Sequence, residues 1–162
     1  MTRMKSRMVE IGTRERRLDV PISLERSLKR KIIGDDAMDV EKQTAYWRGT
    51  SDEDQRIAGI LLEKREYLYA LFFCHLSIEK MLKAHIVKSR HDLPPKIHNL
   101  VRLAALAGVS LTAEQQDFLR EFNEYQIEGR YPSSFPPVID SAAMIEDSKK
   151  AKELREWLKS LL

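Results

Sequence analysis

The sequence predicts an all-α protein with about five helices in one domain. After residue 38, apolar residues recur at spacings of three and four, which is the period of an amphipathic helix. No alternation of apolar and polar residues runs far enough to indicate a strand. Six glycines and six prolines in 162 residues also leave little room for a turn-rich β architecture. A chain of this length suffices for one domain with its own core.

The first expected helix, residues 39–64, carries an acid on its apolar face. Trp47, Ala58 and Leu61 fall on one side of this helix, and Asp54 lies between them on the same side. A buried carboxylate costs free energy unless a cation offsets its desolvation. We therefore expect Asp54 to have a cationic partner.

The second expected helix, residues 67–90, should be the central element of the fold. Its stretch YLYALFFCHLSIEKMLKAHIV is apolar nearly all the way round, whereas a surface helix has one apolar stripe. The connection at 64–66 is short, which predicts an antiparallel hairpin with the first helix. Pro94 and Pro95 forbid continuation of this helix and predict an extended segment.

The later helices are shorter and have clear end signals. A helix over 99–107 should end at Gly108, and the next should begin with a capping box of Thr112 and Gln115 and end near Tyr125. Three prolines and two serines predict a loop over 129–137. The last helix should begin after Asp140 or Ser141 and run close to the C-terminus.

Cysteine content and hydropathy restrict the class of protein. A single cysteine, Cys74, excludes an internal disulfide framework and suits a reducing compartment. No secretory leader and no uncharged apolar run of membrane-spanning length is evident. We therefore expect a cytoplasmic protein that does not enter a membrane.

Residues 1–37 carry most of the net positive charge. They hold ten Lys/Arg against six Asp/Glu, a balance of +4, so the remainder of this +3 chain has −1. A basic arm of this kind can neutralise phosphates on nucleic acid. It can equally be a poorly ordered leader or an upstream extension of a reading frame that starts at Met38. We expect the domain proper to be residues 38–162.

Polar residues on the central helix have structural and functional interpretations. His75, Glu79 and His85 have no familiar metal-ligand spacing, so we expect hydrogen-bonded structural histidines, no metal and no cofactor. Adjacent Cys74 and His75 point in different directions on a helix, which favours a core cysteine over a nucleophile. Glu79 and Lys83 are spaced for an ion pair, expected to be partly exposed. Lys80 shares a face with Ser77 and Ala84, whose small side chains leave space for an approaching group.

Two further segments contain candidate ligand-binding residues. His98 and Lys96 precede the helix at Asn99, where unpaired N–H groups favour an anion; the alternative is a structural cap formed by His98 and Asn99. Arg130 and Tyr131 offer a guanidinium and a stacking surface for a nucleotide or phosphate. We expect Asp54, Lys80 and Arg130 to meet beside His98, either as a structural network or as a phosphate site.

These segments together resemble the HEPN domain family, specifically its prokaryotic nucleotide- or nucleic-acid-binding branch. The matching segments are Tyr46-Trp47 with Asp54, then LFFCHLSIEKMLKA, then PPKIHNL with Leu103, and lastly YQIEGRYP, in this order over residues 38–141. The resemblance implies an up-and-down helical bundle that forms a homodimer. It also implies a minimal nucleotidyltransferase as partner, in a module of toxin–antitoxin type.

The sequence departs from the ribonuclease pattern of that family. HEPN ribonucleases carry an Arg followed four to six residues later by His, but Arg130 has no histidine in that window. Metal-independent RNA cleavage needs a group that moves a proton near neutral pH, and arginine stays protonated. The resemblance therefore favours a non-catalytic nucleotide- or nucleic-acid-binding protein. The alternatives are a metal-independent HEPN ribonuclease toxin with a non-standard active site and an adaptor that only contacts proteins.

Overall fold

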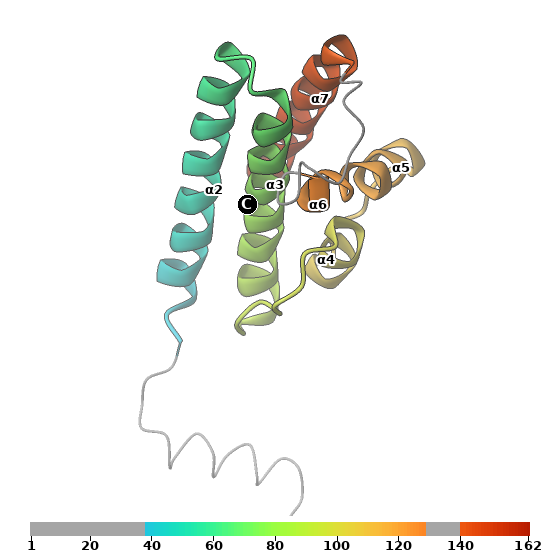
Figure 1. Cartoon of the computed structure of the whole chain (residues 1–162). Coiled ribbons are helices and arrows are strands. Elements are labelled where there is room, and N and C mark those ends of the chain that lie inside the picture. The colour runs from blue at the N-terminus through green and yellow to red at the C-terminus, as the bar shows by residue number, and fades with distance from the viewer. Residues whose placement is uncertain (1–37, 129–139) are drawn as a thin grey trace, which may run out of the picture. The chain divides into compact units, whose positions relative to one another are not determined.

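The computed structural model describes residues 38–128 and 140–162, which confirm the expected all-α fold (Figure 1). Residues 38–162 form one compact unit. Its helices are α2 (Val40–Glu63), α3 (Tyr67–Arg90), α4 (Leu100–Ala107), α5 (Ala113–Phe122), the short α6 (Tyr125–Glu128) and α7 (Ser141–Ser160). The arm at 1–37, the loop at 129–137, Arg130 and Tyr131 lie outside the described residues.

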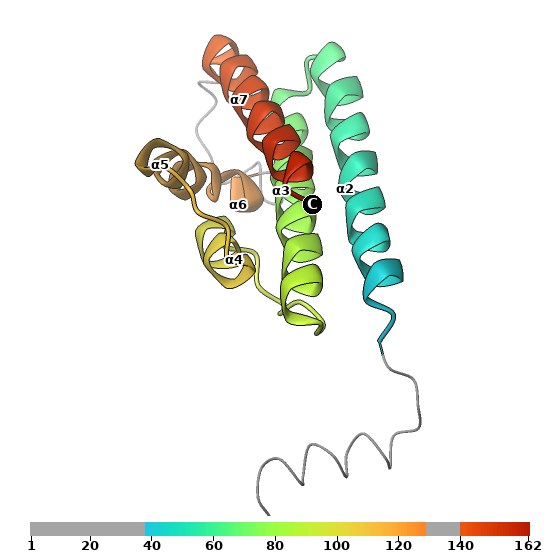
Figure 2. The same cartoon turned by 180° about the vertical axis from the view of Figure 1, so that it is seen from behind.

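Helix α3 is the central element, as its composition predicts. More than half of its residues are buried, and helices α2, α4, α6 and α7 all pack against it. Figures 1 and 2 show α2 and α7 running along α3, while α4, α5 and α6 lie across its side. The bundle is therefore up-and-down in its long helices only, because the three short ones cannot span the length of α3.

Small residues on α3 let α2 approach closely. Ala70, Ser77 and Ala84, spaced by seven, are fully buried. The Ser51 hydroxyl of α2 donates to the Ser77 carbonyl at 2.7 Å, and the Ser77 hydroxyl donates to the Ser51 carbonyl at 3.1 Å. The space that the sequence offered to an approaching group is thus filled by α2.

The predicted capping box of α5 is present, but the end of this helix differs from the prediction. Thr112 and Gln115 exchange both capping hydrogen bonds. Helix α5 ends at Phe122, and α6 follows as a separate turn. The Asn123 side chain accepts a hydrogen bond from the Leu100 N–H at 2.9 Å, so the residue after α5 caps the start of α4. This tertiary contact is not visible in local sequence.

Among the described residues, no helix combines the length and apolar character that crossing a bilayer requires.

Candidate functional site

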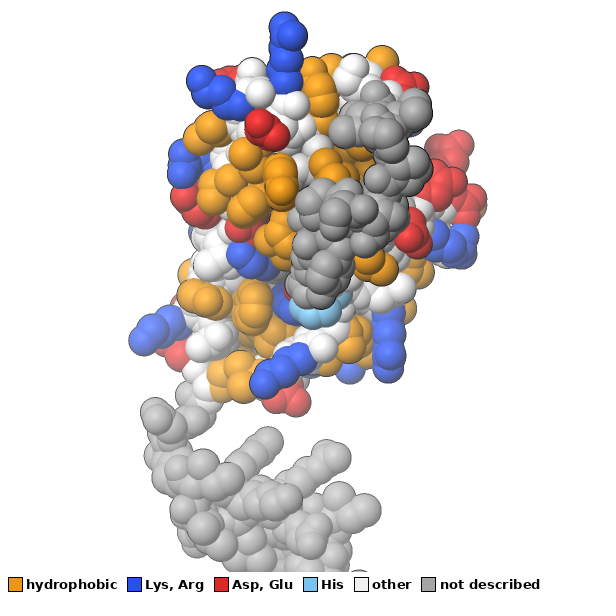
Figure 3. Space-filling view, viewed as in Figure 1, with side chains coloured by type: hydrophobic (Ala, Val, Ile, Leu, Met, Phe, Trp, Pro, Cys, Tyr) orange, Lys and Arg blue, Asp and Glu red, His pale blue; other side chains and the backbone are white. Residues whose placement is uncertain are grey.

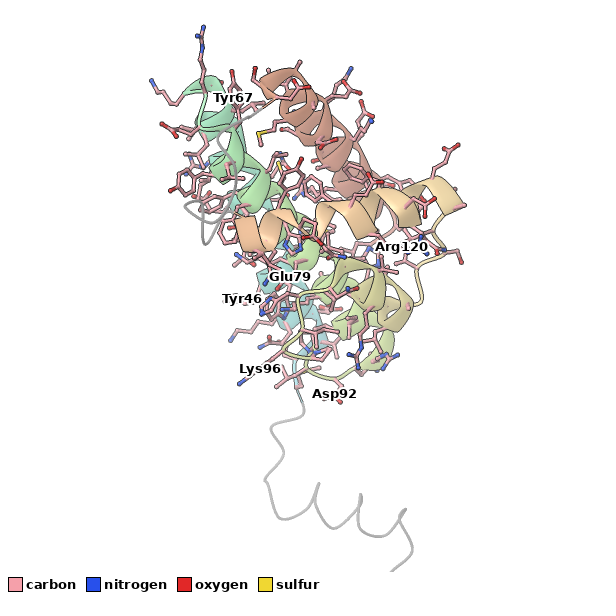
Figure 4. All side chains as sticks on the ribbon, turned by 45° about the vertical axis from the view of Figure 1, so that its right-hand side comes forward. Tyr46, Tyr67, Glu79, Asp92, Lys96 and Arg120 are labelled. Atoms are coloured by element: carbon pink, nitrogen blue, oxygen red, sulfur yellow. The ribbon has the colours of Figure 1, made fainter. Side chains whose placement is uncertain are left out.

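A cluster of five charged or titratable side chains joins α2, α3 and the segment before α4. We call it the Glu79 cluster; its members are Asp54, Glu79, Lys80, Lys83 and His98. Asp54 comes from α2, Glu79, Lys80 and Lys83 come from two adjacent turns of α3, and His98 comes from the extended segment after Pro95. In Figure 4, Glu79 lies inside the domain between these elements.

Glu79 is the centre of the cluster. Its side chain is 5% exposed, and its Oε1 accepts a hydrogen bond from Lys83 Nζ at 2.7 Å. Lys83 is also buried, and its Nζ lies 5.3 Å from the centroid of the Trp47 ring, in the range of a cation–π contact. The expected Glu79–Lys83 pair is therefore formed, but it is buried and not partly exposed, because α2 covers this face of α3.

The second carboxylate oxygen of Glu79 positions His98. Glu79 Oε2 lies 3.0 Å from His98 Nδ1 and 3.9 Å from His75 Nδ1. An ionised carboxylate can only accept, so His98 Nδ1 carries the proton and donates it to Glu79. Within residues 38–128 and 140–162, the other ring nitrogen, Nε2, has no hydrogen-bond partner. The His98 side chain is 45% exposed, so the buried carboxylate orients an accessible imidazole.

Asp54 pairs with Lys80. Lys80 Nζ lies 2.6 Å from Asp54 Oδ2, and the Asp54 residue is buried. Burial raises the pKa of Asp54; Lys80 lowers it, but the nearby Glu53 and Glu79 carboxylates add to the rise, and the pKa stays above its usual value. The Lys80 side chain is 26% exposed, so it lies at the edge of the cluster, whereas Asp54 lies inside it.

The charges of the cluster balance before His98 is counted. Asp54 and Glu79 provide two negative charges, and Lys80 and Lys83 provide two positive ones. A proton on His98 would give the cluster a net charge of +1 at its exposed edge. The cluster can therefore present a positive edge without leaving an unpaired charge in the interior.

Lys96 and Asn99 lie beside the cluster but do not contact Glu79 directly. Lys96 is exposed, and Figure 4 shows it apart from Glu79, toward the end of the domain. The Asn99 side chain accepts a hydrogen bond from the Arg102 N–H at 2.9 Å and so caps α4. Asn123 takes the Leu100 N–H, which leaves few N–H groups at this helix start for an anion.

The other sequence candidates have structural contacts. His85 Nε2 donates to the Leu158 carbonyl at 2.8 Å, and burial lowers its pKa. His75 is fully buried and stacks on Phe122. Cys74 is buried and lies 3.8 Å from the Ser148 hydroxyl. Across the described ranges, no three His, Cys, Asp or Glu side chains are grouped as metal ligands would be.

A second buried network, centred on Arg155 of α7, was not predicted from the sequence. Arg155 is 2% exposed, donates from Nε to the Ser51 hydroxyl at 3.3 Å, and pairs with Asp52 and Glu156. Lys159 also pairs with Asp52 at 2.7 Å. These contacts tie α7 to the α2–α3 hairpin. The only local signal was that Arg155 follows Leu154 on the apolar side of α7.

The comparisons with known proteins agree with the arrangement of these helices. The family model described as "HEPN domain" matches residues 44–161, nearly all of the compact unit. Searches among curated proteins and among solved structures found no match.

Proposed function

Because the chain belongs to the HEPN domain family, we propose that it binds a nucleotide or nucleic acid at the exposed edge of the Glu79 cluster, without cleaving RNA. The supporting observation is the contact of 3.0 Å between the buried Glu79 carboxylate and the half-exposed His98 imidazole. A buried acid on the central helix fixes the ring, so that Nε2 is the nitrogen available for a ligand.

Phosphate is the ligand group that this edge suits. Protonated His98 donates from Nε2 to a phosphate oxygen, and Glu79 stabilises the resulting imidazolium. Lys80 in the cluster and the exposed Lys96, two residues before His98, supply further positive charge. Arg130 and Tyr131 are candidates for the remaining phosphate and base contacts. The Asn99 side chain has a capping role, so its contribution is to hold His98 in place.

Loss of binding in a His98→Ala variant tests this proposal. We expect a labelled RNA oligonucleotide or ATP to bind the full chain and to bind His98→Ala about tenfold more weakly or worse, because a charge-assisted hydrogen bond is lost. His91→Ala removes an exposed histidine outside the cluster and is the matched control. Equal binding by both variants and the wild type, at unchanged melting temperature, contradicts the proposed site.

A ribonuclease with a non-standard active site is the second candidate. The same Glu79–His98 contact favours it, since a carboxylate-oriented imidazole can act as a general base. The missing histidine after Arg130 argues against it. Incubation of RNA with the full chain in the presence of a metal chelator decides between the two. Cleavage that is lost in both His98→Ala and Glu79→Gln, and retained in His91→Ala, would establish the ribonuclease.

The proposed cellular role is in a module of toxin–antitoxin type with a minimal nucleotidyltransferase, in the cytoplasm. The resemblance of the sequence segments to the prokaryotic branch of the family implies this role, and a single buried cysteine suits a reducing compartment. A short nucleotidyltransferase in the neighbouring reading frame should co-purify with this chain in stoichiometric amount. Absence of such a frame, or of a complex when the two are co-expressed, would remove this part of the proposal.

The proposed assembly is a homodimer through the α2–α3 hairpin. Helix α3 is apolar nearly all the way round, but α2, α4, α6 and α7 of the same chain pack against it. Apolar surface remains beside the hairpin connection instead, where Ile60 is 44% and Tyr69 is 43% exposed. Figure 3 shows hydrophobic side chains gathered over this part of α2 and α3. A second copy of the chain would cover this patch.

A further inference from the structure

A groove lies between α5 and α7, away from the Glu79 cluster. Its volume is about 590 Å³, within the range of ligand-binding clefts. Figure 2 shows α5 and α7 as neighbouring helices, and the two make few direct contacts with each other. The cluster, by contrast, is built on α2, α3 and the segment before α4. The groove therefore needs an explanation of its own.

The floor of the groove is apolar. Phe118 comes from α5, and Leu154 and Trp157 come from α7. Phe118 and Trp157 pack on the core from below but are only partly buried. Large aromatic side chains gain free energy when their remaining surface is covered. The floor can accept apolar side chains from a third element placed between the two helices.

The walls of the groove are acidic. Five carboxylates and one ammonium line it; they are Glu114, Asp117, Glu121, Asp147, Glu153 and Lys150. The formal charges of these six side chains add up to −4. Arg120 pairs with Asp117, and the Tyr125 hydroxyl donates to Asp147, so the other three carboxylates have no cation or donor among the contacts of the described residues. Acidic side chains gather over α5 in Figure 3.

We propose that this groove binds a basic amphipathic helix of a partner protein. Apolar side chains of that helix contact Phe118 and Trp157, and its lysines or arginines face the carboxylates of both walls. Helix-in-groove recognition uses an apolar face of this kind, and charge complementarity selects the partner and its orientation. A nucleic acid is excluded here, because its phosphates would meet carboxylates. The groove is thus a protein-binding surface, separate from the phosphate-binding edge.

A designed peptide tests the proposal on the full chain. The probe is a helix of about 18 residues, beyond the marginal length of isolated helices, with leucines on one face and lysines on the other. A second peptide has glutamate in place of every lysine. We expect the lysine peptide to bind one to one, to perturb the NMR signals of the Trp157 indole, and to weaken as salt rises. The glutamate peptide should not bind.

Charge-reversal variants locate the site. Glu121→Lys with Glu153→Lys changes one exposed carboxylate on each wall and should weaken binding of the lysine peptide about tenfold. Glu63→Lys with Glu66→Lys makes the same change in net charge at exposed positions of the α2–α3 connection and should leave binding unchanged. Phe118→Ala, checked for an intact fold by circular dichroism, should also weaken binding because it removes part of the floor.

Three results would overturn the proposal. Equal binding of the lysine peptide by the groove variants and the control variants would mean that only net charge attracts it. Perturbed NMR signals from α2 and α3 would place the peptide on the hairpin patch. Full displacement of the peptide by spermine, with the same perturbation of Trp157, would make the groove a site for small polycations and not for a helix.

Discussion

Asp52 and Asp54 lie two residues apart on α2, and their pKa values shift in opposite directions. Burial raises the pKa of Asp52, but hydrogen bonds from Lys159 and Arg155 outweigh burial, and the pKa is lowered. For Asp54 burial is the larger effect, and the pKa is raised despite Lys80. Two residues that are two positions apart on a helix point to different surroundings. The surroundings of Asp52 therefore stabilise its carboxylate form, whereas those of Asp54 do not.

The two aspartates should contribute oppositely to stability as pH changes. A lowered folded pKa means that Asp52 stabilises the fold above its unfolded pKa, and this contribution is lost as pH falls through the folded value. Because the pKa of Asp54 is raised in the folded protein, Asp54 stabilises the fold most when it is protonated. This stabilising contribution is lost as pH rises through the pKa of Asp54 in the folded protein. Asp52→Asn should therefore be most destabilising near neutral pH, and least so in acid.

Asp54→Asn should show the reverse trend. The free energy of unfolding of this variant should increase relative to that of the wild type as pH rises, because the asparagine has no charge to desolvate. Urea denaturation of both variants and the wild type between about pH 3 and pH 7 covers the titration of both groups. Parallel curves for Asp54→Asn and the wild type would mean that Lys80 fully offsets the burial of Asp54.

Cys74 should be chemically inert in the folded protein. Burial raises the pKa of its thiol to about 11, and thiolate is the reactive form. We expect no reaction with a thiol reagent such as DTNB until the protein is unfolded, and complete reaction in denaturant. Rapid labelling of the native protein would mean that α7 separates readily from α3, since Ser148 of α7 contacts Cys74.

At the scale of elements, α7 is attached to the hairpin by a buried arginine. Arg155 donates to Ser51 and pairs with Asp52, so one side chain connects α7 to α2. Its guanidinium directs several donors at once, whereas a lysine would offer a single charge. The attachment of α7 therefore depends on geometry as well as on charge.

Arg155→Ala should lower the free energy of unfolding by about 2–4 kcal/mol, since buried hydrogen bonds are lost and a void is left. Arg155→Lys should recover only part of this loss. Lys152→Ala, at an exposed position of the same helix, is the control and should change stability little. Chemical denaturation measures all three. A value for Arg155→Ala equal to that of the control would show that α7 is held by its apolar face alone.

At the scale of the whole molecule, the apolar patch beside the hairpin connection should determine the oligomeric state. Ile60→Glu with Tyr69→Glu places two charges in the proposed dimer interface and should convert the dimer into a monomer, as light scattering after gel filtration would show. Ile145→Glu alters a similarly exposed apolar residue on α7 and should leave the dimer intact. A wild-type protein that is monomeric at micromolar concentration contradicts the dimer outright.

Residues 1–37 should affect nucleic-acid binding through charge. Their excess of four positive charges can neutralise phosphates, so a chain that starts at Met38 should bind RNA more weakly and with a smaller salt dependence. Binding constants measured at several salt concentrations give the dependence of affinity on salt, as a slope, for the full chain and for the shortened chain. Identical slopes would show that only the domain contacts RNA.

The sequence by itself determined the fold class, the central position of α3 and most helix ends. These follow from local causes: the apolar period, the Thr112–Gln115 capping box, Gly108 and the two prolines at 94 and 95 act within a few residues of where they stand. The need of Asp54 for a cationic partner was also predictable, because a carboxylate on an apolar face is costly wherever it is buried.

Only the tertiary structure decided how deeply these pairs are buried and which distant polar groups join them. The Glu79–Lys83 pair follows from its spacing on α3, and the Asp54–Lys80 pair was also expected, but the burial of Glu79 and Lys83 depends on how closely α2 approaches. Contacts between Glu79 and His98, and between Arg155 and Ser51, join residues 19 and 104 positions apart. No local pattern encodes such distances, since they arise from the packing of whole helices. The acidic groove likewise exists only because α5 and α7 come to lie beside each other.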